Sequence, residues 1–454
     1  MASRKSSATS NIALVAIAPV VLALLASTAA FAQTLPTLHR FAAQSGGTIP
    51  LSGTLLADQS ANLYGTTNYG GASNDGTVFE LSPPVTDGAW TETVLHSFAG
   101  GSDGVSPTGH LVADAVGNLY GVTAFGGSGS SGIVYQLVPP ATTGGGWTEN
   151  VLYSFQGFAD GSFPSAGLIF DSSGNLYGET GFGGSCATNQ GSGTIYELSP
   201  PTVPGNPWTK TTLFSFTQNC GGTDGHSPSG GLVLGKGGAL YGTTTFGGAP
   251  QGTEPAEGTV FRLGPPVAGK TEWTFSTLHT FTVGTDGMNP RAGVVFDSKG
   301  NLYGTTQAGG DLSACPSGTP GCGTAFELSP AGGGVWNETI IYAFTGGNDG
   351  GDPFTPLLVD GNGNLYGTAT NGGVGTCAGS QLGGCGSVFK LIPPSTSGGT
   401  WTEVTLHTFT GTSSDEGMPY SGVIFGKNHR LFGTVAGNNL ATPKQYGTVF
   451  KVVP

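Results

Sequence analysis

Charged residues are scarce in this chain, and helical sequence patterns are missing. Only 9% of the 454 residues are Asp, Glu, Lys or Arg. Beyond residue 32, no stretch has the 3.6-residue hydrophobic period of an amphipathic helix, and none is long and apolar enough to span a membrane. With 14 basic and 27 acidic residues, the net charge is −13. That balance argues against nucleic acids as partners.

The common signatures of catalysis are missing as well. The sequence contains no G-x-S-x-G, H-E-x-x-H or phosphate-loop motif. Four of the seven histidines occupy one repeated position, which other copies fill with Tyr or Phe: His39, His96, His279 and His407. Exchange with aromatic residues indicates packing. We therefore predict no catalytic residue, metal or cofactor, although a carboxylate pair for glycoside hydrolysis is compatible with the chain.

Glycine, by contrast, is abundant, and much of it lies in a repeated motif. The chain has 83 glycines without the period of three that collagen requires. Variants of LYGTT occur seven times, centred on Tyr64, Tyr120, Tyr177, Tyr241, Tyr303, Tyr366 and Phe432. A motif copied this often marks a structural unit. Each unit of about 56–66 residues holds four short pieces rich in β-branched and aromatic residues, bounded by Gly, Pro, Asp or Ser.

The order of these pieces predicts a closed ring. The third piece occurs seven times, from 76–81 to 447–452, whereas the fourth follows it only six times. A matching fourth piece, TLHRF at 37–41, precedes the first unit. We predict an all-β fold: a seven-bladed β-propeller of four-stranded blades, closed by the N-terminal strand completing the last blade. A linear solenoid, the alternative, has no reason to begin with its last strand.

The N-terminus resembles an export signal. Residues 1–32 contain Arg4 and Lys5, an apolar run at 12–26 and an A-x-A site at 30–32. A transmembrane anchor is the alternative, but the run is short for a span. We expect a signal peptide at 1–32 and the propeller at 33–454. The mature protein is then secreted or periplasmic and monomeric, with no membrane span.

Two further repeated features have a structural interpretation. All six tryptophans begin a fourth piece: Trp90, Trp147, Trp208, Trp273, Trp336 and Trp401. A sugar-binding platform is one interpretation, but the recurrence favours packing between blades. The glycine after each central Tyr or Phe, as in Tyr64-Gly65, lies inside a strand. We expect an aromatic ring to cover each of these glycines.

Candidate binding residues lie on the face formed by the Gly-Gly loops and the links between blades. One set is six aspartates, each four residues before a proline: Asp103, Asp160, Asp224, Asp286, Asp349 and Asp415. They suit cation or polyol binding, or turns in which Asp accepts backbone N–H groups. The other set follows the second strands: Tyr69, Phe125, Phe182 and Phe246. These rings either pack against other side chains of the protein or form a platform for a ligand. Longer loops in units three to six predict a cleft beside the low rim of units one and two.

The six cysteines form three predicted disulfides on that face. Cys315 and Cys322 share one long loop, and Cys377 and Cys385 share the equivalent loop of the next unit. Cys186 and Cys220 lie in a loop and in the following link. An even count in an exported chain supports disulfides. Zinc is the alternative, but the spacings are unlike those of zinc ligands.

The unit LYGTTxxGG…GTVFELSPP…WTETVLHSF resembles the GloVer tandem repeat of bacterial exported "choice-of-anchor" proteins, and more weakly the kelch repeat. The resemblance covers the chain after residue 32 and implies export, without an established activity. We expect a binding or scaffold module at the cell exterior, for a glycan or a protein. The alternatives are an extracellular carbohydrate-active enzyme and a purely structural envelope protein.

Overall fold

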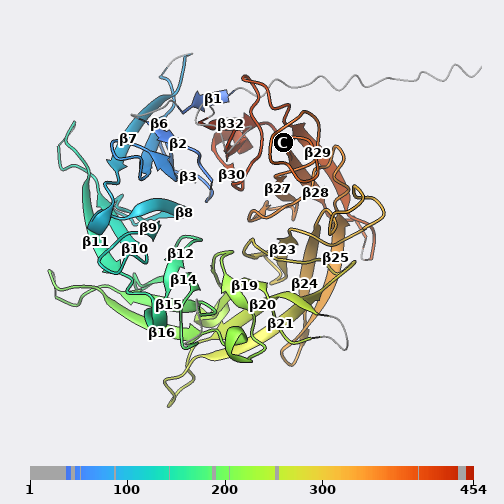
Figure 1. Cartoon of the computed structure of the whole chain (residues 1–454), viewed down its shortest axis with the longest axis horizontal. Coiled ribbons are helices and arrows are strands. Elements are labelled where there is room, and N and C mark those ends of the chain that lie inside the picture. The colour runs from blue at the N-terminus through green and yellow to red at the C-terminus, as the bar shows by residue number, and fades with distance from the viewer. Residues whose placement is uncertain are drawn as a thin grey trace, which may run out of the picture. The chain divides into compact units, whose positions relative to one another are not determined.

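The described residues form seven antiparallel blade sheets arranged around a common centre (Figure 1), besides one short two-stranded sheet. The computed structural model describes residues 37–454 apart from 42–45, 52, 86–87, 143, 187–190, 204, 251–254, 397 and 438–445. The chain divides into two units, Met1–Gln33 and Thr34–Pro454. All seven sheets belong to the second unit. The first unit, where we predict the signal peptide, lies outside the described residues.

Blades 1 to 3 follow one another along the chain, each beginning with its innermost strand. Blade 1 consists of β3 (Leu56–Ala57), β4 (Leu63–Thr67), β6 (Thr77–Ser82) and β7 (Thr91–Ser97). Blade 2 consists of β8 (Val105–Ala113), β9 (Leu119–Phe125), β10 (Ile133–Val138) and β11 (Thr148–Ser154). Blade 3 consists of β12 (Ser162–Pro164) with β13 (Ile169–Phe170), then β14 (Leu176–Phe182), β15 (Thr194–Ser199) and β16 (Thr209–Ser215).

Blades 4 to 6 repeat this order. Blade 4 consists of β17 (His226–Pro228) with β18 (Val233–Leu234), then β19 (Leu240–Phe246), β20 (Ala256–Gly264) and β21 (Thr274–Thr282). Blade 5 consists of β22 (Val295–Phe296), β23 (Leu302–Thr306), β24 (Thr324–Gly332) and β25 (Val335–Ala343). Blade 6 consists of β26 (Leu358–Val359), β27 (Leu365–Ala369), β28 (Ser387–Ile392) and β29 (Thr402–Thr408).

Short elements complete the description. β2 (Gly47–Thr48) pairs with β5 (Tyr69–Gly70) at the start of blade 1. Five single-turn 3-10 helices lie in loops: η1 (Gly101–Asp103), η2 (Phe158–Asp160), η3 (Gln218–Cys220), η4 (Lys236–Gly238) and η5 (Lys427–His429). No described helix is long and apolar enough to cross a membrane.

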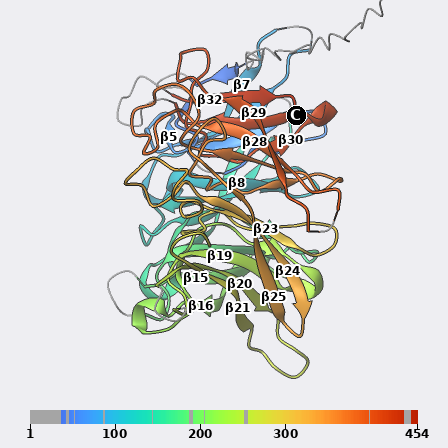
Figure 2. The same ribbon diagram turned by 90° about the vertical axis from the view of Figure 1, so that its right-hand side faces the viewer.

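Blade 7 joins the two ends of the propeller. Its strands are β30 (Ile424–Phe425), β31 (Leu431–Val435), β32 (Thr448–Val452) and β1 (Thr37–Arg40). β1 is antiparallel to β32, with Arg40 opposite Thr448, and the Phe41 N–H donates to the Gly447 carbonyl at 3.1 Å. Both views place β32 next to blade 1 (Figures 1 and 2). The predicted ring closure is confirmed, and a linear solenoid is excluded.

Aromatic contacts run around this ring. The last residue of each fourth-strand motif is a buried Phe that contacts the third strand of the next blade, as Phe98 contacts Tyr135 with ring centroids 5.2 Å apart. Phe41 makes the same contact with Phe79 at 5.0 Å, from blade 7 to blade 1. The tryptophans also bridge blades: Trp208 lies 6.3 Å from Tyr120. The interpretation of the tryptophans as blade-to-blade packing is confirmed.

The glycine of each Tyr-Gly pair lies under an aromatic ring, as predicted. A Cβ atom added to Gly65 would lie 2.6 Å from Cζ of Phe79, which is closer than carbon atoms pack. Tyr or Phe rings cover the equivalent glycines of the other six blades: Gly121, Gly178, Gly242, Gly304, Gly367 and Gly433. Only glycine lets the second strand approach the ring of the third.

The first strand of each blade is kinked at an X-Pro step. The residue before the proline has a left-handed φ between 53° and 61° in all seven blades: Ile49, Ser106, Phe163, Ser227, Asn289, Asp352 and Met418. This conformation costs about 1–2 kcal/mol per non-glycine residue, so the surrounding structure must hold it. In blade 3 the kinked residue, Phe163, and Pro164 lie at the end of β12. The residue after each proline then lies at the central channel.

Candidate functional site

The candidate site is a cavity in the mouth of the central channel. Its volume is about 330 Å³, and residues from all seven blades line it. Phe125, at the end of β9, and Tyr69, two residues after the end of β4, are among them, which places the cavity on the face of the Gly-Gly loops. The volume is at the lower end of the range of small-molecule sites, about 300–1,000 Å³.

One repeat position differs from blade to blade in this cavity. It is the residue after the X-Pro kink, which is Leu51, Thr108, Ser165, Ser229, Arg291, Phe354 and Tyr420 in blades 1 to 7, and all seven line the cavity. Small hydroxyl side chains occupy it in blades 2 to 4, and large side chains occupy it in blades 5 to 7. The sevenfold pseudosymmetry of the scaffold is therefore lost at the channel mouth, as expected of a binding site.

The four predicted aromatic residues take different positions. Tyr69 and Phe125 line the cavity and are 44% and 50% exposed. Phe182 is outside the lining and packs on Phe163, whose ring lies between Phe125 and Phe182 at 5.3 and 5.7 Å. Phe246 stacks on His226 at 5.4 Å, away from the cavity. Two of the four rings are therefore available to a ligand in the mouth, and their binding role remains a prediction.

The cavity presents one permanent charge. Among the described lining residues, only Arg291 is a Lys, Arg, Asp or Glu. The buried carboxylate of Asp352 acts on it electrostatically and accepts a hydrogen bond from Asn371 Nδ2. Burial raises the pKa of Asp352 to about 6, against the opposing effects of Asn371 and Arg291. Burial lowers the pKa of His110, whose Nε2 lies 3.0 Å from the Leu168 carbonyl oxygen.

The six predicted aspartates lie at the junctions between blades, and none lines the cavity. Each carboxylate accepts a backbone N–H from the start of its own link, as Asp286 does from Thr282 at 2.7 Å. The other donors are Ala99, Gln156, Thr217, Thr345 and Thr410. Five also contact the His or Tyr of the fourth strand: His96, Tyr153, His279, Tyr342 and His407. These bonds match the turn interpretation, while cation or polyol binding remains a prediction.

Two of these aspartates face a glutamate of the next blade. Burial, together with the facing Asp103, raises the pKa of Glu149 to about 9. Burial raises the pKa of Glu338 to about 7, with Asp286 acting in the same direction and His279 against it. Each of these junctions holds two carboxyl groups in a partly desolvated space.

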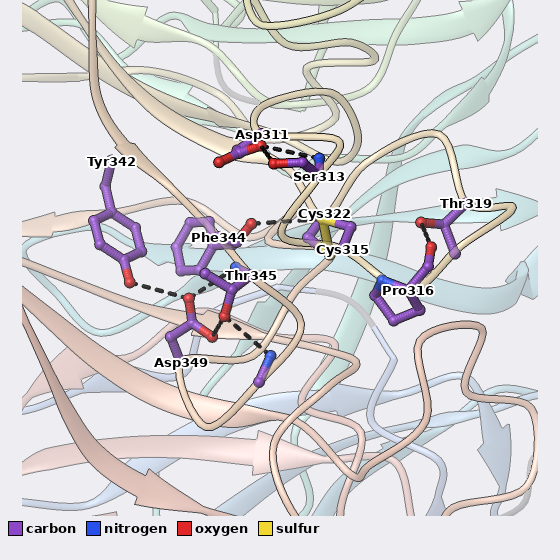
Figure 3. Close-up of a disulfide and its surroundings, with 11 residues drawn as sticks. Asp311, Ser313, Cys315, Pro316, Thr319, Cys322, Tyr342, Phe344, Thr345 and Asp349 are labelled. Atoms are coloured by element: carbon purple, nitrogen blue, oxygen red, sulfur yellow. Dashed lines mark hydrogen bonds between the residues drawn. A yellow bond between two sulfur atoms is a disulfide. The ribbon is translucent and has the colours of Figure 1, made fainter.

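The disulfides form as predicted. Cys186 pairs with Cys220, Cys315 with Cys322 and Cys377 with Cys385, with Cα–Cα distances of 5.7, 5.9 and 5.2 Å. Figure 3 shows Cys315–Cys322 beside Phe344 and the Asp349 turn, where Asp349 accepts from Tyr342 and Thr345. Cys186–Cys220 fastens a long loop to the following blade link, whereas each of the other two bridges lies within one long loop. Three disulfides indicate an oxidising, extracytoplasmic compartment.

Two other cavities lie outside the channel mouth. One, of about 170 Å³, lies between the long loops of blades 5 and 6 and is lined by Thr319 and Gln381, among others. This cavity lies within the wall of long loops and has no described lining residue from blades 1 or 2, so the predicted cleft beside the low rim stays a prediction. Another of about 930 Å³ lies on the opposite face, between blades 7 and 1, and borders Val85 and Gly88. Residues 86–87 between them are not described, so we do not assign a site there.

Sequence reasoning missed the large side chains of the channel mouth. Arg291, Phe354 and Tyr420 each follow a proline that recurs in every unit. Aligning the seven units on that proline would have shown that this position changes from hydroxyl to large side chains. That the position faces the channel depends on the left-handed residue before the proline, and the sequence shows no rule for that conformation.

Comparison with known proteins supports the repeat assignment and the fold. The model of the Gloeobacter/Verrucomicrobia repeat matches residues 25–144, 86–315 and 141–380. No curated protein matches the chain. A fungal alcohol oxidase of the AA5 family in complex with copper has a TM-score of 0.51 at 16% identity, covering 92% of this chain and 76% of that one.

Two polysaccharide lyases are also similar in structure. A PL25 ulvan lyase has a TM-score of 0.48 at 10% identity, covering 91% of this chain and 96% of that one. The lyase Uly1 has a TM-score of 0.48 at 11% identity, covering 90% and 91%. The likeness to the alcohol oxidase concerns the fold alone, and the two lyases carry no argument about this chain. The repeat model spans most of the chain, which therefore belongs to the Gloeobacter/Verrucomicrobia repeat family.

Proposed function

We propose that this protein is an extracytoplasmic binding module that takes a glycan into the mouth of its channel. The observation that carries the proposal is the divergence of the repeats at the position after the X-Pro kink. The Tyr-Gly pair, the tryptophan and the last Phe of the fourth strand, which pack the propeller, recur around the ring. At the position after the kink, Arg291, Phe354 and Tyr420 line the cavity in blades 5 to 7, and hydroxyl side chains line it in blades 2 to 4.

The chemistry of the mouth suits a sugar. Aromatic rings at Tyr69, Phe125 and Tyr420 offer apolar faces to C–H groups, and Thr108 and Ser165 offer hydroxyls near them. Arg291 adds a donor for a carboxylate or sulfate group. We expect a glycan segment that is neutral or carries one such group.

Two other functions remain alternatives. Glycoside hydrolysis by the usual route needs two carboxyl groups about 5–10 Å apart, and no described residue lining the mouth is Asp or Glu. This favours binding over hydrolysis. A purely structural envelope protein would have no need of an asymmetric channel mouth.

The test is a glycan array with a parallel hydrolysis screen on the exported chain. We expect binding without turnover. Phe125→Ala and Tyr420→Ala are each expected to weaken binding about tenfold, since stacked rings contribute about 0.5–1.5 kcal/mol beyond their buried area. Phe246→Ala is the matched control, because Phe246 ends the second strand of blade 4 but lies away from the cavity.

Several results would contradict the proposal. One is the absence of binding to any glycan by a folded chain. Another is binding that Phe246→Ala weakens as much as Phe125→Ala. Release of sugar fragments would support the alternative of a carbohydrate-active enzyme.

A further inference from the structure

Each junction between blades brings together the fourth strands of two neighbours and the aspartate of the link. The first blade contributes the His, Tyr or Phe of its fourth strand. The second contributes the residue two positions after its tryptophan: Glu92, Glu149, Lys210, Phe275, Glu338 and Glu403 in blades 1 to 6. We call this residue the junction residue. The type of the junction residue, and the side chains next to it, differ from one junction to the next.

At the junction of blades 2 and 3 the junction residue is a cation. Lys210 Nζ lies 2.9 Å from Asp160 Oδ1, 2.7 Å from the Asp160 carbonyl oxygen and 2.8 Å from Thr212 Oγ1. Its side chain is only 5% exposed and lies over the Tyr153 ring. This junction therefore contains a buried positive charge that compensates the link aspartate.

At two other junctions the junction residue, equivalent to Lys210, is a glutamate. His96, Asp103 and Glu149 meet between blades 1 and 2, and His279, Asp286 and Glu338 meet between blades 4 and 5. Within each triad the ligand atoms lie within 4.8 Å of one another. The imidazole Nε2 lies 3.0 Å from Asp103 Oδ1 in the first triad and 3.2 Å from Asp286 Oδ1 in the second.

One oxygen in each triad has no partner. Oε1 of Glu149 and Oε1 of Glu338 are buried and accept no hydrogen bond from the described residues. Two carboxyl groups therefore face each other where the junction of blades 2 and 3 supplies an ammonium group. The chain itself shows that a cation fits this place.

We propose that each triad binds a divalent transition-metal ion, with zinc as the representative ion, and that the two ions fasten blade 1 to blade 2 and blade 4 to blade 5. Imidazole nitrogen and carboxylate oxygen are ligands that zinc accepts, at about 2.0–2.2 Å. Ligands at that distance in a tetrahedron stand about 3.3–3.5 Å apart, so small side-chain shifts complete the site. Water takes the fourth position.

Three other junctions lack at least one of the three ligands and provide internal controls. Between blades 5 and 6, Tyr342 replaces the histidine, and Glu403 Oε1 accepts from Thr405 Oγ1 at 3.0 Å. Between blades 3 and 4, Phe214 stacks on Phe275 at 4.3 Å. Between blades 7 and 1, Gly46 takes the place of the aspartate, which leaves His39 with Glu92.

The test is a zinc titration of the exported, chelator-treated chain against a chromophoric competitor, with elemental analysis after gel filtration. We expect two equivalents of zinc per chain, one for each triad. Glu149→Gln is expected to lose one equivalent, and Glu149→Gln with Glu338→Gln to lose both. Glu403→Gln, at the same position of a junction without histidine, is expected to keep both.

Circular dichroism establishes that each variant is folded. If a Gln variant fails to fold, His96→Phe replaces it, since the chain already carries Phe at this position in Phe214. Failure of the wild type to retain zinc after gel filtration would overturn the proposal. Two equivalents that persist in the double variant would also overturn it, because they would mark adventitious surface sites. The proposal would also be overturned if Glu403→Gln and Glu149→Gln lost the same amount of bound zinc.

Discussion

Phe41→Ala is expected to lower the free energy of unfolding by about 3–5 kcal/mol, the usual cost of truncating a buried Phe. Phe41 is fully buried and packs on Phe79 of blade 1, next to Leu55 and Leu81. It is the main apolar anchor of β1, a strand of only four residues. Urea denaturation followed by tryptophan fluorescence measures the change.

Phe98→Ala is the matched control, because Phe98 fills the same position in blade 1 and is equally buried. Both variants are expected to lose a similar free energy. In Phe41→Ala we also expect β1 to exchange its amide hydrogens faster, because this strand lies near the chain end and can open locally. A normal stability for Phe41→Ala beside a destabilised Phe98→Ala would mean that β1 is not docked.

Glu179→Gln is expected to stabilise the protein at pH 8 by about 3 kcal/mol and to change little at pH 5. Glu179 is 2% exposed, accepts the Gly231 N–H of the next blade at 2.8 Å and leaves Oε2 without a described partner. Burial raises its pKa to about 7. The folded state therefore favours the protonated acid, and stability falls as the pH rises from about 4.5 to about 7.

The size of this effect follows from a pKa of about 7 in the folded protein against 4.5 for an exposed Glu, because a difference of one in pKa corresponds to about 1.36 kcal/mol. The same position carries Thr in blades 4 to 7, at Thr243, Thr305, Thr368 and Thr434. Glu179→Thr is therefore a second variant that should fold and show the same trend. Unfolding curves at pH 5, 6, 7 and 8 test the prediction, and a wild-type-to-variant difference that is constant over this range would contradict it.

The fold could be predicted because its determinants are repeated. Seven copies of the Tyr-Gly pair give the number of blades, and TLHRF at 37–41 supplies the strand that the last unit lacks. Tryptophan packing and the covered glycines followed from the same recurrence. The disulfides could be paired because equivalent loops lie on one face of a propeller.

The site could be predicted only in part, because it depends on residues that differ from one repeat to the next. The predicted Tyr69 and Phe125 line the cavity, whereas Phe182 and Phe246 pack elsewhere, although all four occupy equivalent positions in their repeats. Whether such a ring lines the cavity or packs on a neighbour depends on the side chains around it. The junction triads were missed because Asp103 and Glu149 come from different units, and their meeting depends on how two blades dock.

The central claim is that the N-terminal strand closes the ring, and a disulfide across β1 and β32 tests it most directly. Arg40 lies opposite Thr448, and paired residues of antiparallel strands have Cα atoms about 4.5–5.5 Å apart, within reach of a disulfide. We predict that the double variant Arg40→Cys, Thr448→Cys forms this bond within one molecule, seen by mass spectrometry as a linked peptide pair. Free thiols at both positions, or links only between molecules, would contradict the closed ring.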